Sequence, residues 1–185
     1  MKERKFPHFE TDRLILNEIQ TGDQENIFRG LSHPEVIRYY GVQYSSFEET
    51  QEQMDWYTNL KNSNSGLWWA IRLKESNEFC GAIGINDYHP EYHKAEIGFW
   101  LLPEYWGKGI IAEAANTIIP FLFDHKGLHR IEAYVEAGNH NSARLLKKLC
   151  FELEGRMVDC EVKDGKYISV DIFAKIDNPN WHLPE

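Results

Sequence analysis

Apolar residues recur along the whole chain at spacings that predict short strands and helices. Two runs, Leu67 to Leu73 and Phe79 to Asp87, predict neighbouring strands joined by a polar turn. A third run, Ala95 to Leu102, predicts another strand, and a helical pattern then extends from Gly109 to about His125. Leu128 to Glu136 predicts the strand after this helix. Two strands joined by a helical crossover are expected to lie parallel in one sheet.

Shorter patterns surround this central unit. An alternating run from Arg13 to Ile19 predicts the first strand. The remaining predicted elements are helices from Thr21 to Leu31, Ser32 to Tyr40, Ser46 to Lys61 and Asn139 to Leu149, and a final hairpin of Phe151 to Val162 with Tyr167 to Lys175. The order predicts a single α/β domain over residues 1–185, with one mixed central sheet of about seven strands and flanking helices.

The link between the third strand and the long helix is the most distinctive segment of the sequence. It reads Pro103-Glu104-Tyr105-Trp106-Gly107-Lys108-Gly109, with two glycines around a lysine immediately before the helix. A glycine turn that opens a helix leaves backbone N–H groups without intrahelical partners at the positive end of the helix dipole. Such an end binds phosphate groups well, so the sequence predicts a phosphate site in this turn.

Two nucleotide-binding motifs can be compared with this turn. Residues 107–112 match the dinucleotide pattern G-x-G-x-x-A, and Glu132 or Glu136 could be the acidic residue that follows it. That pattern normally opens a doubly wound sheet, whereas here it comes after about a hundred residues and is followed by one crossover. Lys108 is not followed by the Ser or Thr of a Walker loop. An NAD-binding oxidoreductase is therefore the minor alternative.

Three segments together resemble a known family. Ala95 to Gly109 looks like the acetyl-CoA motif of the GNAT N-acetyltransferases, and is closest to the branch that includes the ribosomal-protein (alanine) N-terminal acetyltransferases. Glu10 to Leu16 resembles the opening strand of that branch, and Asn139 to Glu152 resembles its Asn-x-x-Ser helix and following turn. The segments occur in the family's order and spacing, so the resemblance implies the GNAT fold over residues 10–176.

The resemblance also implies where acetyl-CoA, the co-substrate of the family, would bind. In GNAT proteins the two parallel strands splay apart, and the pantetheine arm pairs with the free edge of the first strand. The pyrophosphate rests on N–H groups of the glycine turn. Carried over to this chain, the binding residues are Trp100, Leu101, Leu102, Trp106, Gly107, Lys108, Gly109, Ile110, Ile111, Ala112, Asn139 and Ser142.

Four positions depart from the family pattern. Trp106 stands where the turn usually begins with Gln or Arg, Ile111 stands where Gly or Ala is usual, and Cys150 replaces the Gly before Phe151. Because backbone N–H groups make most of the phosphate contacts, these changes need not abolish binding. Leu146 occupies the position of the tyrosine that protonates the sulfur in many GNAT enzymes, so that mechanism is not expected.

Two residues are candidates for the proton transfers of acetylation. By alternation Glu96 shares a strand face with Gly98 and Trp100, beside the expected splay. Desolvation there would raise its pKa and suit a general base, whereas an ion pair would make it a structural glutamate. In the ribosomal-protein branch the serine matching Ser142 can reach the thiolate and act as the acid. Ser142 could equally satisfy backbone donors in the first turn of a helix capped by Asn139.

Composition and charge narrow the class of partner. A chain with 42% hydrophobic residues and a net charge of −9 is typical of a globular protein and argues against nucleic-acid binding. We find no apolar run of membrane-spanning length and no secretory signal after Met1. Neither the three cysteines nor His89 and His93 have the spacing of a metal site, so no metal is expected. These features are typical of a cytoplasmic protein.

Together the residues and the resemblance predict an acetyl-CoA-dependent N-acetyltransferase. The acceptor would be a primary amine, either a protein or peptide N-terminus or a small amine. No cysteine or serine has an obvious activating partner, which favours direct attack in a ternary complex without a covalent enzyme intermediate. A non-catalytic GNAT module that binds acyl-CoA is the alternative within the family. The sequence is compatible with either a monomer or a homodimer.

Overall fold

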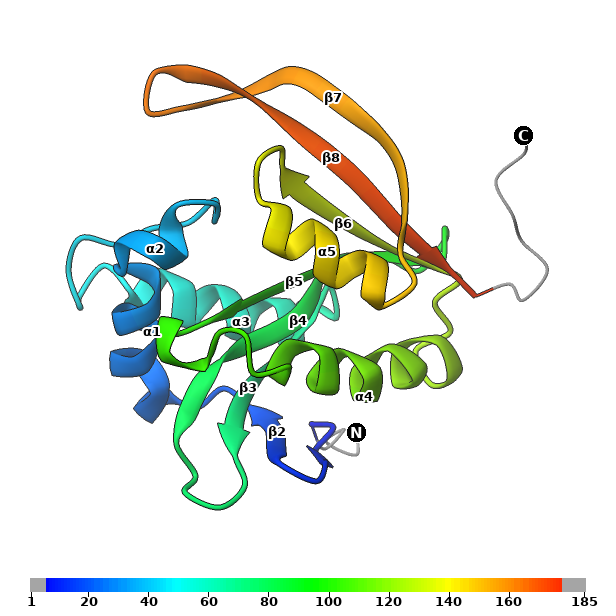
Figure 1. Cartoon of the computed structure of the whole chain (residues 1–185). Coiled ribbons are helices and arrows are strands. Elements are labelled where there is room, and N and C mark those ends of the chain that lie inside the picture. The colour runs from blue at the N-terminus through cyan, green and yellow to red at the C-terminus, as the bar shows by residue number, and fades with distance from the viewer. Residues whose placement is uncertain (1–5, 178–185) are drawn as a thin grey trace.

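The computed structural model describes residues 6–177, and the strands in this part of the chain form one mixed sheet of eight (Figure 1). The strands are β1 (Phe9–Glu10), β2 (Leu14–Glu18), β3 (Leu67–Leu73), β4 (Phe79–His89), β5 (Lys94–Leu101), β6 (Arg130–Glu136), β7 (Glu152–Lys163) and β8 (Lys166–Ile176). They lie side by side in the order β1-β2-β3-β4-β5-β6-β8-β7. Neighbours are antiparallel except β5 and β6, which are parallel and are connected through a helix.

Helices cover both faces of this sheet. The helical elements are η1 (Thr21–Asp23), α1 (Gln24–Leu31), α2 (Pro34–Ile37), α3 (Gln51–Ser63), η2 (Pro103–Tyr105), α4 (Ile110–Asp124) and α5 (His140–Lys148). Strand alternation builds two buried clusters: Trp69 and Ile71 pack with α4 and α5, whereas Trp68 and Ala70 pack with α1 and α3. Within residues 6–177, no helix combines the length and apolar character needed to cross a lipid bilayer.

The mixed α/β architecture predicted from the sequence is confirmed, with differences at the N-terminal side. β1 was not predicted, because a two-residue strand has no alternation to detect, and it raises the described sheet from about seven strands to eight. The third helix begins at Gln51 and not at Ser46. The Ser46 hydroxyl caps an earlier turn by accepting a hydrogen bond from the Glu49 N–H at 3.2 Å. The second helix is shorter than predicted and ends at Ile37.

The parallel pair is the feature of the sheet that positions the site. β5 and β6 pair at only three positions, which are Lys94 with Arg130, Ala95 with Ile131 and Glu96 with Glu132. Beyond Glu96, β5 continues to pair with β4 but no longer with β6, whereas β6 pairs with β8 along its whole length. The two strands therefore splay apart from Glu96 onward, as predicted. Residues 97–101 therefore have one backbone edge that is not paired with another strand.

Candidate functional site

The glycine turn has the backbone conformation of an anion-binding site. Gly107 and Gly109 adopt φ angles of 72° and 75°, in the left-handed region that glycine enters without strain. Gly109 is the N-cap of α4, and the first backbone bond of the helix joins the Glu113 N–H to the Gly109 carbonyl at 3.1 Å. In the described part of the chain, the N–H groups of residues 107–112 have no hydrogen-bond acceptor. They are available to an anion at the positive end of the helix.

The structure explains two of the unusual residues in this turn. The Trp106 side chain folds back, and its Nε1 donates a hydrogen bond to the Leu101 carbonyl at 2.9 Å. Trp106 thus ties the turn to the end of β5. The Ile111 side chain is buried in the cluster between α4 and the sheet, so it does not compete with a ligand for space. With both departures in place, the N–H groups of residues 107–112 still have no acceptor within the described part of the chain.

The three predicted ligand-binding residues at the end of β5 have buried side chains. Trp100, Leu101 and Leu102 are each less than 8% exposed, and their side chains lie in the two buried clusters. Any ligand contact at these three positions is therefore made through N–H and C=O groups. This is the arrangement that a ligand carrying amide groups can extend as an added strand.

Glu96 lies at the point where β5 and β6 separate. The half-buried side chain lies on β5 opposite Asn86 of β4, and none of the ion pairs in residues 6–177 includes it. Burial, together with the negative charges of Asp87 and Glu132, raises the pKa of Glu96 to about 7. The carboxyl group therefore changes its ionisation near neutral pH, which is the range in which a general base is most effective.

Glu132, its partner on β6, has the opposite environment. Its carboxylate receives hydrogen bonds from Arg130 Nε at 2.7 Å and from Lys94 Nζ at 3.1 Å. Burial opposes ionisation, but these two cations outweigh it and hold the pKa of Glu132 below its ordinary value. The nearby cations are thus bound to Glu132, and Glu96 remains in a field of like charge.

Asn139 and Ser142 meet at the start of α5, as the sequence predicts. Asn139 Oδ1 accepts a hydrogen bond from the Ser142 N–H at 3.2 Å, so Asn139 caps the helix. The half-buried Ser142 hydroxyl makes no hydrogen bond to any other described residue, and is left for another partner. Leu146, one turn further on, is fully buried in the core and takes no part in the site.

Trp68 on β3 lies across the same sheet face as Glu96. A Cβ atom at Gly84 would lie 2.4 Å from its Cγ, and one at Gly98 would lie 2.8 Å from its Cη2. The indole therefore extends over both glycines to the position next to Glu96 on β5. Its Nε1 is buried and has no hydrogen-bond partner among the described residues. The two glycines give room for this side chain.

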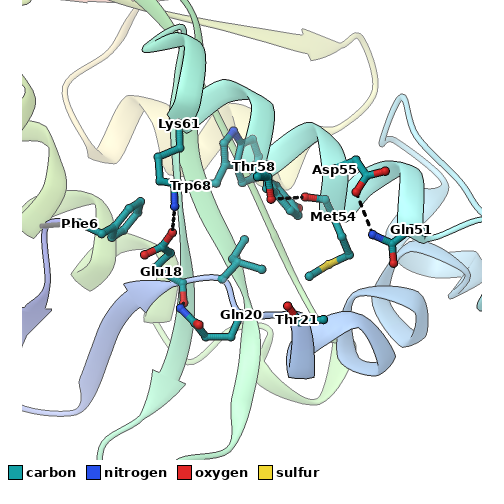
Figure 2. A pocket seen from close by; sticks show the side chains of 12 residues that line it. Phe6, Glu18, Gln20, Thr21, Gln51, Met54, Asp55, Thr58, Lys61 and Trp68 are labelled. Carbon is teal, nitrogen blue, oxygen red and sulfur yellow. Dashed lines mark hydrogen bonds and ion pairs between the residues drawn. The ribbon is translucent and has the colours of Figure 1, made fainter. Parts of the chain in front are cut away.

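A cavity of about 320 Å³ lies between α3 and the end of β2. Trp68 contributes to its wall, and Glu18 and Lys61 form an ion pair beside it (Figure 2). None of the predicted catalytic or acetyl-CoA-binding residues lines this cavity.

Sequence reasoning missed residues that act across long separations. The acidic side chains around Glu96 were not connected with it, and Glu132 was weighed only as part of a dinucleotide motif. Lys163, at the end of β7, was also missed: its Nζ lies 3.0 Å from Glu136 and donates to the carbonyls of Ile37 and Arg38. Lys163 thereby joins the β7–β8 hairpin to α2 and to β6. A carboxylate on each parallel strand was the available signal for the Glu96 site, but no local pattern indicates Lys163.

Comparison with known proteins identifies relatives along most of the chain. Residues 13–152 match the family model of the acetyltransferase (GNAT) domain. The uncharacterized N-acetyltransferase YoaA of Bacillus subtilis is 34% identical over 170 residues, which cover 91% of this chain and 96% of that protein.

Two solved structures share the fold of this chain. RimL, a ribosomal L7/L12 α-N-protein acetyltransferase solved with coenzyme A, has a TM-score of 0.83 at 20% identity, covering 92% of this chain and 98% of RimL. The spermidine N-acetyltransferase of Vibrio cholerae, solved with CoA and spermine, has a TM-score of 0.80 at 22% identity, covering 90% and 96%. At these identities the two structures are evidence for the fold alone.

Proposed function

Because the chain belongs to the GNAT acetyltransferase family, we propose that it transfers the acetyl group of acetyl-CoA to a primary amine with Glu96 as the general base. The observation that carries this proposal is the position of Glu96 at the end of the β5–β6 pairing, with a pKa raised to about 7 and no counterion among the described residues. A base with this pKa is ionised in part at neutral pH and still binds a proton well.

Different residues of the site bind different parts of acetyl-CoA. The pyrophosphate binds the N–H groups between Trp106 and Ala112, and the pantetheine arm pairs with the open edge of residues 97–101. Asn139 contacts the amide groups of pantetheine, and Ser142 lies near the sulfur. The unpaired N–H groups of the turn and the free Ser142 hydroxyl support this assignment. RimL and the spermidine N-acetyltransferase, which share the fold, were solved with CoA, and the proposal carries that ligand over to this chain.

The reaction proceeds by direct attack in a ternary complex. The amine nitrogen attacks the thioester carbonyl carbon, a C–N bond forms, and the C–S bond breaks. Glu96 accepts the proton that the amine loses. The Ser142 hydroxyl donates a proton to the departing thiolate and regains one from solvent. Leu146 is buried and cannot supply the proton, which supports the role of Ser142.

The acceptor is either a peptide N-terminus, as in the ribosomal-protein acetyltransferases, or a small amine such as a polyamine. The names of the structural relatives include one of each kind. Asp87, Glu132 and Glu161 all add negative potential at Glu96, which favours an acceptor that carries positive charge. The three cysteines are free thiols, which supports a reducing cytoplasmic environment.

An acetyl-CoA turnover screen tests this proposal. The acceptors are polyamines, aminoglycosides, amino acids and ribosomal-protein N-terminal peptides, and Glu96→Gln is the matched low-activity control. We expect turnover with at least one class and a strong loss in the variant. Binding of CoA without turnover of any amine would favour the non-catalytic module. Binding of NAD(H) without CoA would favour the oxidoreductase.

A further inference from the structure

Arg13, which immediately precedes β2, connects the glycine turn to the first turn of α4. Its Nη1 donates a hydrogen bond to the Lys108 carbonyl at 3.1 Å. Its Nε and Nη2 lie 2.7 Å and 2.6 Å from Glu113 Oε2. The guanidinium therefore holds a carboxylate with one edge and a main-chain carbonyl with the other, which its planar fork of donors allows.

Further donors complete the environment of Glu113. The Thr11 hydroxyl and the Arg13 backbone N–H both donate to Glu113 Oε1, the second at 3.2 Å. Burial opposes the charge, but the hydrogen bonds from Thr11 and Arg13 outweigh it and hold the pKa of Glu113 below its ordinary value. Glu113 is therefore ionised at neutral pH, with both oxygens occupied by donors from the segment before β2.

The bond to Lys108 has a consequence for the turn. In a trans peptide unit the C=O and the following N–H point in opposite directions. Because Arg13 holds the Lys108 carbonyl, the Gly109 N–H points away from Arg13, on the side where an anion can approach. The guanidinium also lies close to the turn, since a Cβ atom at Gly109 would be 3.7 Å from Arg13 Nη2. Arg13 thus fixes the orientation of the peptide between the two glycines.

The ion pair has a second, electrostatic consequence. Glu113 lies in the first turn of α4, at the helix end where the proposed pyrophosphate binds. A bare carboxylate at this position would repel a diphosphate. Arg13 compensates that charge, so the helix end keeps its attraction for an anion.

We propose that Arg13 is a positioning residue for acetyl-CoA, which acts through the Lys108 carbonyl and Glu113 and does not touch the ligand. Thr11 supports it by occupying the second oxygen of Glu113. This inference rests on the proposed function, because it requires a diphosphate in the glycine turn. It adds a role for the segment before β2, which lies more than ninety residues away from the turn.

The test compares an acetyl donor that has the diphosphate with one that lacks it. For Arg13→Gln we expect the Kd for CoA, measured by titration calorimetry, to rise about tenfold or more. kcat/KM with acetyl-CoA falls in proportion, whereas kcat/KM with acetyl-pantetheine stays within about twofold. Arg13→Lys keeps the charge but loses the fork, so its affinity for CoA should be intermediate. Thr11→Val should show a smaller loss in the same direction.

Arg29→Gln is the matched control. Arg29 forms an exposed ion pair at 3.2 Å with Glu104, which is close in sequence to the same turn, and within residues 6–177 it makes no hydrogen bond to a carbonyl of the turn. Its CoA affinity should remain unchanged. The inference would be overturned if Arg13→Gln lowered kcat/KM equally with acetyl-CoA and with acetyl-pantetheine, or if its Kd for CoA were unchanged. Failure of the wild-type protein to bind CoA would instead overturn the proposed function.

Discussion

Glu96 on β5 is paired with Glu132 on β6 at the last position where the two parallel strands meet. The two carboxylates are neighbours, but the nearby cations contact only one of them. Arg130 and Lys94 bind Glu132, whereas Glu96 forms no ion pair with any of the described residues. This unequal division produces one carboxylate that stays ionised and one whose pKa is raised to about 7.

Replacing Glu96 should remove a limb of the pH–rate profile. A carboxyl group with a pKa of about 7 is protonated below that pH and cannot accept a proton, so kcat/KM should rise as the pH passes through about 7. Glu96→Gln should lose about 10²- to 10⁴-fold in kcat and lose this limb. Steady-state kinetics between pH 5.5 and 9 with the identified amine measures both effects. An unchanged profile in the variant would contradict the assignment of the base.

Removing a neighbouring negative charge should move the same limb. Asp87 is exposed, and its charge is the largest contribution to the Glu96 pKa after burial. Asp87 has a left-handed φ of 49°, which asparagine also tolerates, so Asp87→Asn is a conservative change. The apparent pKa in kcat/KM should fall. Glu91→Gln, an exposed change in the same loop, should leave it in place.

Substitution of Ser142 should affect catalysis, whereas substitution of Asn139 should affect the stability of the helix. The Ser142 hydroxyl makes no hydrogen bond to the described residues, so Ser142→Ala should leave thermal unfolding nearly unchanged while lowering kcat. Asn139→Ala removes the cap of α5 and should cost about 1 kcal/mol of unfolding free energy. Calorimetric melts combined with kcat measurements distinguish the two. A large loss of stability in Ser142→Ala would show that its hydroxyl is structural.

Gly109→Ala should weaken CoA binding more than its effect on stability explains. The substitution forces a side chain into a left-handed conformation, at a cost of about 1–2 kcal/mol. It also changes the turn whose N–H groups face the ligand. Gly127→Ala imposes the same backbone strain, at φ 67° with open space around it, so it is the matched control. We expect similar losses of stability, but a higher Kd for CoA in Gly109→Ala alone; equal Kd values would place the phosphate elsewhere.

The sequence by itself determined the local features of this protein. Apolar periodicity predicted β3 at its observed bounds, Leu67–Leu73, and the glycine pattern predicted a turn that opens α4. Asn139 was identified as a helix cap, and the splay of the parallel strands followed from the family resemblance. The strand, the turn and the helix cap depend on residues within a few positions of one another, so spacing and turn chemistry are sufficient to predict them. The splay joins segments far apart in the sequence, and only the resemblance implied it.

Only the tertiary structure decided how charges are shared between distant segments. Whether Glu96 is ion-paired depends on the pairing of β5 with β6, because that pairing brings Lys94 of β5 to Glu132 of β6, and no local pattern contains that information. The same holds for the contact of Arg13 with Lys108, which joins the start of the chain to the glycine turn. Electrostatic interactions act through space over several ångströms, so the ionisation of a carboxylate and the orientation of a peptide depend on neighbours that only folding brings together.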